Sequence, residues 1–130
     1  GLEDVVEFTG RIPDAGVEAI LSTADVCVGP DPKNPLNDVS TMNKILEYMA
    51  LGRPIVAFDL RETRYSAGEG ALYARPNEVT DLAARIEELL RDPARRAAMG
   101  EYNRRRFQDG MAWDYSRLRL LEAYERIGTR

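Results

Sequence analysis

The chain has 130 residues, which is the size of one domain, and 44% of them are hydrophobic. This composition can fill a packed core, which argues against a disordered polymer. Eighteen basic and 22 acidic side chains give a net charge of −4, which offers no electrostatic reason to expect nucleic acid as a partner.

The histidine and cysteine counts limit the possible chemistry further. The sequence has no histidine, so it cannot supply an imidazole base or a His-ligated metal site. Cys27 is the only cysteine, which excludes an intrachain disulfide and a cysteine metal cluster. No apolar run approaches the roughly 20 residues of a membrane-spanning helix, and no signal peptide is recognisable. We therefore expect no transmembrane segment and a cytoplasmic location, with attachment of a longer protein to a membrane surface left open.

The first half of the chain predicts strands that alternate with helices. Residues 5–8 form a β-rich run, and residues 17–23 have the apolar spacing of one helix face. A compact apolar run at 26–28 stops at a Gly-Pro pair and predicts a buried strand. Residues 30–39 are rich in Pro, Asn and Asp and therefore predict a loop.

The clearest predicted helix covers residues 41–50. Its apolar residues follow the i, i+3, i+4, i+7 spacing and predict one buried stripe. Ser40 or Thr41 is expected to cap its first turn with a hydroxyl group, and Gly52 is expected to end it. The stripe consists of Met42, Ile45, Leu46, Met49 and Ala50.

The second half of the chain continues the alternation and then becomes helical. The expected segments are strands at 55–58 and 71–74, helices at 62–66, 79–90 and 93–107, a break at Gly110, and a last helix from Trp113. Short strands separated by helices predict an α/β fold, a Rossmann-like parallel sheet flanked by helices with a helical C-terminal tail. About four strands are few for such a sheet, so we interpret residues 1–130 as a single domain that is cut inside its sheet.

A candidate ligand site follows from the helix at residues 41–50. In open parallel sheets, ligands bind beyond the carboxyl ends of the strands, where helix N-termini favour anions. Lys44 and Glu47 lie one turn apart on that helix and project away from its apolar stripe. A cation beside free amides suits a phosphate, and a carboxylate can accept two hydrogen bonds from the vicinal diol of a ribose. The same spacing also fits a solvent-exposed surface pair, and both interpretations stay open at this point.

Several ordered motifs together cover nearly the whole chain. The longest is NDVSTMNKILEYMALGRPIVA at residues 37–57, in which a loop, a Lys-x-x-Glu-Tyr-Met-Ala helix, a Gly-x-Pro turn and a Val-rich strand follow one another. VEFTGRIP precedes it at residues 6–13 and ADVCVGP at residues 24–30, and residues 81–113 follow it. These motifs resemble, in the same order, the C-terminal donor-binding domain of the retaining GT-B glycosyltransferases of family 4. The resemblance implies a partial GT-B domain that binds a nucleotide-diphosphate sugar.

The resemblance also implies roles for individual residues. By position, Glu47 would bind the ribose hydroxyls of the donor. The other implied donor contacts are Lys44, the amides around Ser40, Thr41, Met42 and Asn43, and the Gly10-Arg11 pair near the base or phosphates. The implied reaction transfers the sugar to an acceptor hydroxyl on a sugar or glycolipid. No metal ion or other cofactor is implied, and the motifs identify no catalytic residue.

The sequence departs from the family pattern at Val39, where the family often has a second glutamate eight residues before the ribose-binding one. The family's basic pair for the leaving diphosphate and its acceptor-binding N-terminal domain would lie upstream of residue 1. We therefore expect the isolated chain to be inactive in sugar transfer. The alternative function is a non-catalytic α/β nucleotide-binding or protein-interaction module. An exposed apolar face on the last helix is expected to support a homodimer of the isolated chain.

Overall fold

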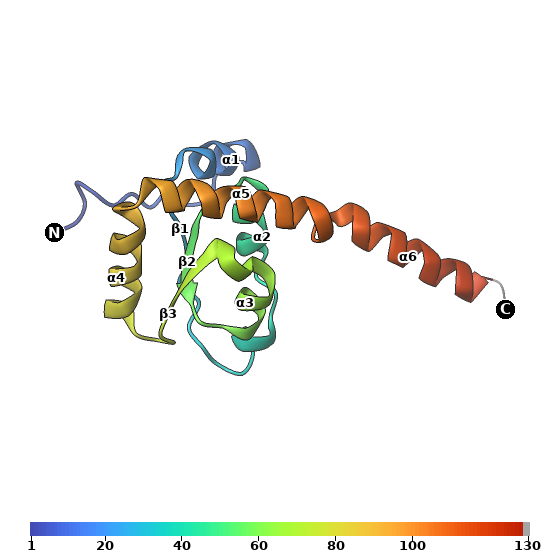
Figure 1. The fold of residues 1–130 in the computed structure, drawn as a ribbon. Coiled ribbons are helices and arrows are strands. Elements are labelled where there is room, and N and C mark those ends of the chain that lie inside the picture. Colours follow the sequence, from blue (N-terminus) through green and yellow to red (C-terminus); the bar gives the residue numbers. More distant parts are fainter. Residues whose placement is uncertain (129–130) are drawn as a thin grey trace.

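The computed structural model describes residues 1–128, and Figure 1 shows a small sheet with helices packed against it. Three parallel strands pair in the order β1-β2-β3, which confirms the predicted α/β class with a parallel sheet. The strands are β1 (Cys27–Gly29), β2 (Ile55–Phe58) and β3 (Ala71–Ala74). The helices are α1 (Asp14–Thr23), α2 (Asn43–Ala50), α3 (Arg61–Ala67), α4 (Val79–Leu90), α5 (Pro93–Gly110) and α6 (Trp113–Gly128), with short 3-10 turns η1 (Asn37–Val39) and η2 (Gly68–Gly70).

The central strand β2 divides the core into two layers, because successive strand residues point to opposite faces. Ile55 and Ala57 pack on one face against Ile45 and Met49 of α2 and against α3. Val56 and Phe58 pack on the other face, where α4 covers the sheet. The predicted apolar stripe is confirmed for Met42, Ile45, Leu46 and Met49, which belong to the first of these layers.

Helix α5 joins the two layers. Pro93 occupies its first turn as predicted, and the Asp92 carboxylate caps it by accepting a hydrogen bond from Arg95 N at 2.9 Å. Met99 packs in the α4 layer, whereas Phe107 packs against the α2 layer. The helix continues through residue 110, three residues beyond the predicted end, and Trp113 opens α6 as expected.

The predicted strand at residues 5–8 is wrong. These residues form no strand, and the side chains of Val5 and Phe8 are 78% and 93% exposed. A strand needs a neighbour to satisfy its backbone, and within residues 1–128 the sheet consists of β1, β2 and β3, with β1 at its edge. Residues 5–8 therefore have strand propensity but no strand to pair with within residues 1–128.

Two helices contribute nothing to the buried core. Neither α1 nor α6 contains a buried residue. Figure 1 shows α6 extending away from the body of the molecule as a continuation of α5. Its apolar side chains are exposed, among them Trp113 (64%), Leu118 (56%), Tyr124 (67%) and Ile127 (70%).

Candidate functional site

Helix α2 carries the residues that the sequence singled out. It begins at Asn43, two residues later than expected, and the predicted hydroxyl cap is wrong, since no side chain of residues 1–128 caps it. Ser40 Oγ instead donates to the carbonyl oxygen of Leu36 at 2.7 Å. Thr41 Oγ1 donates to Glu62 Oε2 at 3.1 Å. Because both hydroxyls bind elsewhere, the first amides of α2 keep their ability to bind an anion.

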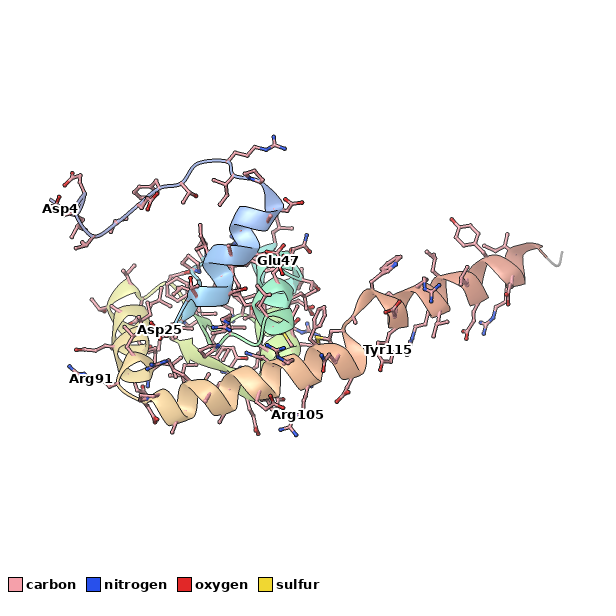
Figure 2. All side chains as sticks on the ribbon, turned by 90° about the horizontal axis from the view of Figure 1, so that it is seen from above. Asp4, Asp25, Glu47, Arg91, Arg105 and Tyr115 are labelled. Carbon is pink, nitrogen blue, oxygen red and sulfur yellow. The ribbon has the colours of Figure 1, made fainter. Side chains whose placement is uncertain are left out.

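Glu47 lies one turn into α2, and its exposed side chain stands between two hollows. One hollow of about 470 Å³ separates α2 from α1 and is also lined by Asp14 and Glu18. The other, of about 430 Å³, lies between α2 and the start of α6 and includes Asn43 and Trp113. Figure 2 shows Glu47 on α2 beside α1. A ligand in either hollow can therefore reach the Glu47 carboxylate.

The Lys44 side chain lies outside the two hollows beside Glu47 and contacts the loop after β1. Its Nζ atom forms an ion pair with Asp31 Oδ1 at 2.6 Å, and Asp31 belongs to the loop that follows β1. Lys44 is not among the described residues that line either hollow beside Glu47. The structure therefore places the two predicted residues on one helix but does not bring their side chains into one cavity. The ion pair with Asp31 holds the ammonium group near the N-terminal end of α2.

Gly10 and Arg11 precede α1 in an exposed stretch of chain. Gly10 has a φ of 63°, a conformation that glycine adopts without strain. Neither residue is among the described residues that line the hollows beside Glu47, but Asp14, three residues further on, lines one of them. Gly10 and Arg11 therefore lie just before α1, the helix that faces Glu47 across the hollow.

The loops after the three strands are tied together at the carboxyl edge of the sheet. Lys33 N donates to Asn77 Oδ1 at 2.7 Å, and Asn77 Nδ2 donates to the Lys33 carbonyl oxygen at 3.2 Å. The Lys33 Nζ atom lies 3.3 Å from Asp38 Oδ1 and donates to the Asp59 carbonyl oxygen at 3.3 Å. These contacts connect the loops that follow β1, β2 and β3.

Sequence reasoning missed this loop cluster. Asn77 has a φ of 63°, a left-handed conformation that asparagine tolerates better than most residues. The Pro76-Asn77 pair after the last strand is a turn signal, and it could have drawn attention to this position. Its partner Lys33 lies 44 residues earlier, and no local pattern predicts that pairing.

A pH dependence follows from Asp59 in this cluster. Arg64 donates to both of its carboxylate oxygens, at 2.8 and 2.7 Å, and these hydrogen bonds hold the pKa of Asp59 below its ordinary value. A lowered pKa in the folded state favours the carboxylate, so the stabilising contribution is present above the unfolded pKa of about 3.9 and is lost as pH falls through the folded value. We expect Arg64→Gln to raise the pH at which Asp59 titrates, measured by NMR of its carboxyl carbon.

Asp38 is the internal control for that titration. The pKa of Asp38 is also lowered, mainly because its carboxylate accepts a hydrogen bond from the Arg61 amide at 2.9 Å. This bond does not involve Arg64, so the Asp38 titration should stay in place in the Arg64→Gln variant. An Asp59 that titrates at the same pH in both proteins would contradict the assignment.

Comparison with known proteins decides the family. A family model described as glycosyl transferases group 1 matches residues 1–92. The chain belongs to this family. This confirms the resemblance to glycosyltransferases that the motifs indicated.

The relatives that this chain matches are longer proteins. It is 27% identical to the 2-deoxystreptamine glucosyltransferase of Streptomyces kanamyceticus, with 98% of this chain and 32% of that protein covered. It is 29% identical to the MMP alpha-(1->4)-mannosyltransferase of Mycolicibacterium hassiacum, with 100% of this chain and 31% of that protein covered. The chain therefore spans about a third of the length of these curated relatives.

A solved structure agrees with the family in fold. The sucrose-phosphate synthase of Thermosynechococcus elongatus matches 98% of this chain and 31% of its own chain, with a TM-score of 0.80 and 26% sequence identity. The chain thus has the fold of a GT-B glycosyltransferase domain. No helix within residues 1–128 is both long and apolar enough to cross a membrane. Within the same residues, no group of three or more His, Cys, Asp or Glu side chains is arranged to hold a metal ion.

Proposed function

We propose that this chain is the donor-binding part of a retaining glycosyltransferase, which transfers a sugar from a nucleotide-diphosphate sugar to an acceptor hydroxyl. The observation that carries the proposal is the exposed carboxylate of Glu47, which faces the hollow between α1 and α2. A carboxylate there can accept both hydrogen bonds of a ribose diol. Family membership supports glycosyl transfer as the reaction class.

The charges around Glu47 suggest how the donor lies. Asp14 and Glu18 share its hollow, so a diphosphate placed among these carboxylates would be repelled. The nucleoside therefore occupies the hollow, and the diphosphate lies toward Lys44 and the first amides of α2. In this arrangement the amides of residues 40–43 contact the diphosphate or sugar, and Gly10 lies with Arg11 near the base or phosphates. The proposal requires no metal ion or cofactor.

The proposal assigns the positioning of the reacting acceptor hydroxyl to other parts of a longer protein. Glycosyl transfer requires the leaving diphosphate to be stabilised and the acceptor hydroxyl to be positioned, and we expect both functions to come mainly from other parts of the longer protein, which leaves the isolated chain inactive. We also propose that the isolated chain associates with a second copy through the exposed apolar side chains of α6.

Val39 is 60% exposed at the position where the family often has glutamate. This departure favours a second candidate function, a module that binds nucleotide without catalysis. Sugar transfer by the longer protein would exclude this second candidate.

Calorimetry with uridine, UDP and UDP-sugar, and with the guanosine series, tests the donor site. We expect Glu47→Ala to weaken binding of nucleoside and nucleotide alike by about 10- to 100-fold, because hydrogen bonds from the ribose to a charged acceptor are lost. Lys44→Gln should weaken UDP or GDP while leaving the free nucleoside unchanged, because only the diphosphate is proposed to approach Lys44. The two variants therefore separate ribose recognition from phosphate recognition.

Glu122→Ala is the matched control for this experiment, since Glu122 is an exposed glutamate on α6 outside both hollows. It should bind nucleotides as the unaltered chain does. Equal affinities of the Glu47→Ala and Glu122→Ala variants would refute the ribose role of Glu47. Measurable sugar transfer by the isolated chain would refute its expected inactivity.

A further inference from the structure

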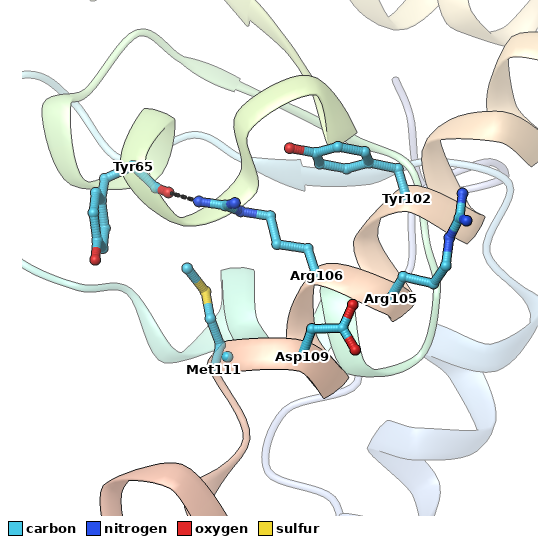
Figure 3. Close-up of a pocket in the computed structure, with 7 residues that line it drawn as sticks. Tyr65, Tyr102, Arg105, Arg106, Asp109 and Met111 are labelled. Atoms are coloured by element: carbon cyan, nitrogen blue, oxygen red, sulfur yellow. Dashed lines mark hydrogen bonds between the residues drawn. The ribbon is translucent and has the colours of Figure 1, made fainter.

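A second concave site lies away from Glu47, between α3 and the C-terminal turns of α5. Its volume is about 520 Å³, within the range of about 300–1,000 Å³ that is usual for small-molecule sites. Figure 3 shows this pocket, with the Arg106 side chain extending between the two tyrosines. The lining residues are Tyr65, Tyr102, Arg105, Arg106, Asp109, Gly110 and Met111.

Two tyrosine rings form the walls of this α3–α5 pocket. Tyr65 comes from α3, and 68% of its surface is exposed, so its ring is not used to fill the core. Tyr102 comes from α5, and its hydroxyl group lies against Gly68. A Cβ atom at Gly68 would lie only 2.7 Å from Tyr102 Oη, so the position of this ring depends on the glycine. The pocket therefore offers aromatic surface on two sides.

Arg106 forms a fixed donor group in the pocket. Its Nε atom donates to the Ser66 carbonyl oxygen at 2.7 Å, and its Nη2 atom donates to the Tyr65 carbonyl oxygen at 2.6 Å. These two bonds hold the guanidinium plane against the end of α3. A guanidinium carries five N–H donors, so further donors remain for a ligand.

Two arginines and one aspartate line the pocket, and one of the arginines is paired with a glutamate outside the lining. Arg105 Nε lies 3.4 Å from Glu101 Oε1, and Asp109 is the one carboxylate among the lining residues. No hydrogen bond or ion pair to another residue within 1–128 occupies the Asp109 carboxylate, which therefore stays free to accept hydrogen bonds. A phosphate or another anion would meet this carboxylate and the paired Arg105. The unpaired Asp109 carboxylate and the ion-paired Arg105 therefore favour a neutral ligand that both donates and accepts hydrogen bonds.

A sugar ring has this chemistry. The C–H bonds on one of its faces pack against aromatic rings, and pairs of its hydroxyl groups bind a carboxylate or a guanidinium. We propose that the α3–α5 pocket is a binding site for neutral oligosaccharides, built on Tyr65, Arg106 and Asp109 and separate from the nucleotide site.

The location of the pocket suggests a use in sugar transfer. Met111 lines both this pocket and the hollow that contains Glu47 and Trp113, so the two sites lie on either side of the end of α5. This role rests on the proposed function: an acceptor chain held in the pocket by distant sugar units raises the local concentration of acceptor near the donor. The binding itself is independent of that role and can be measured on the chain alone.

Titration of the labelled 130-residue chain with maltotriose and mannotriose, followed by amide NMR, tests the site. Glucosyl and mannosyl transfer both occur in the names of the relatives, which is the reason for these two probes. We expect saturable shifts at residues 65–68 and 105–111 with a dissociation constant of about 1 mM for at least one trisaccharide. Tyr65→Ala and Asp109→Ala should each weaken that binding by about tenfold.

Two controls keep the outcomes distinct. Tyr115→Ala removes another exposed tyrosine, on α6 outside the pocket, and should bind the trisaccharide normally. Glu47→Ala should also bind it normally, so a failure of the nucleotide site leaves this result intact. Absence of saturable shifts with both trisaccharides overturns the proposal. Shifts confined to other parts of the chain, or tighter binding of inorganic phosphate at the same amides, overturn it as well.

Discussion

Gly70→Ala should lower the free energy of unfolding by about 3 kcal/mol or more. A Cβ atom at Gly70 would overlap the side-chain amide of Asn103, which is fully buried. Asn103 Nδ2 donates to the carbonyl oxygens of Arg53 and Gly70, at 2.8 Å each. Displacing Asn103 would break both hydrogen bonds and leave buried carbonyl groups unsatisfied. Urea unfolding followed by circular dichroism measures the loss.

Gly16→Ala is the matched control, because the added Cβ atom would meet Ile12 at an ordinary 3.4 Å. In a helix such as α1 this substitution should be neutral or stabilise by up to about 1 kcal/mol. A double variant makes the test sharper. Once Asn103→Ala has removed the overlapping atoms, adding Gly70→Ala should cost little more. A full additional loss in the double variant would contradict the steric explanation.

Gly100→Ala is expected to destabilise the chain by about 3 kcal/mol and to weaken nucleotide binding as well. The added Cβ atom would overlap the carbonyl oxygen of Gly52, just beyond the end of α2. This neighbour is backbone and cannot rotate away, so α2 and α5 must separate. Because α2 carries Glu47, the separation changes the proposed donor site. Urea unfolding and calorimetry with UDP or GDP measure the two effects.

Gly110→Ala provides the comparison within the same helix. Nothing lies within 4 Å of a Cβ atom at this position, so this variant should be as stable as the unaltered chain or slightly more stable, and it should bind nucleotide equally well. If Gly100→Ala kept the unfolding free energy within about 0.5 kcal/mol of the unaltered chain, the close approach of α2 and α5 would not be required.

Most of the fold could be predicted from local spacing. The apolar stripe of α2 and the short buried runs at β1 and β2 have periodicities that depend only on neighbouring residues. Residues 5–8 have the same β-rich character, but pairing requires a second strand, and propensity contains no information about that partner. The hydroxyl cap failed for a similar reason, because Thr41 binds Glu62, 21 residues away.

The candidate site could be predicted only in part. Helix periodicity correctly placed Glu47 on the exposed side of α2. It could not show that Lys44 pairs with Asp31 or that Asp14 faces Glu47, because these contacts depend on how a loop and α1 pack in space. The α3–α5 pocket was missed for the same reason, since Tyr65 and Asp109 are 44 positions apart in sequence.

The Asn77 side chain has a consequence for how the sheet comes apart. Its amide bonds to both backbone groups of Lys33, as a residue on an adjacent strand would do. These hydrogen bonds connect the loop after β1 to the loop after β3, beyond the end of β2. The two outer strands, each paired with β2, are thus also joined to one another, and the contacts form a closed ring. One strand cannot detach without opening that ring, so the sheet should open and exchange its amide hydrogens as a single cooperative unit.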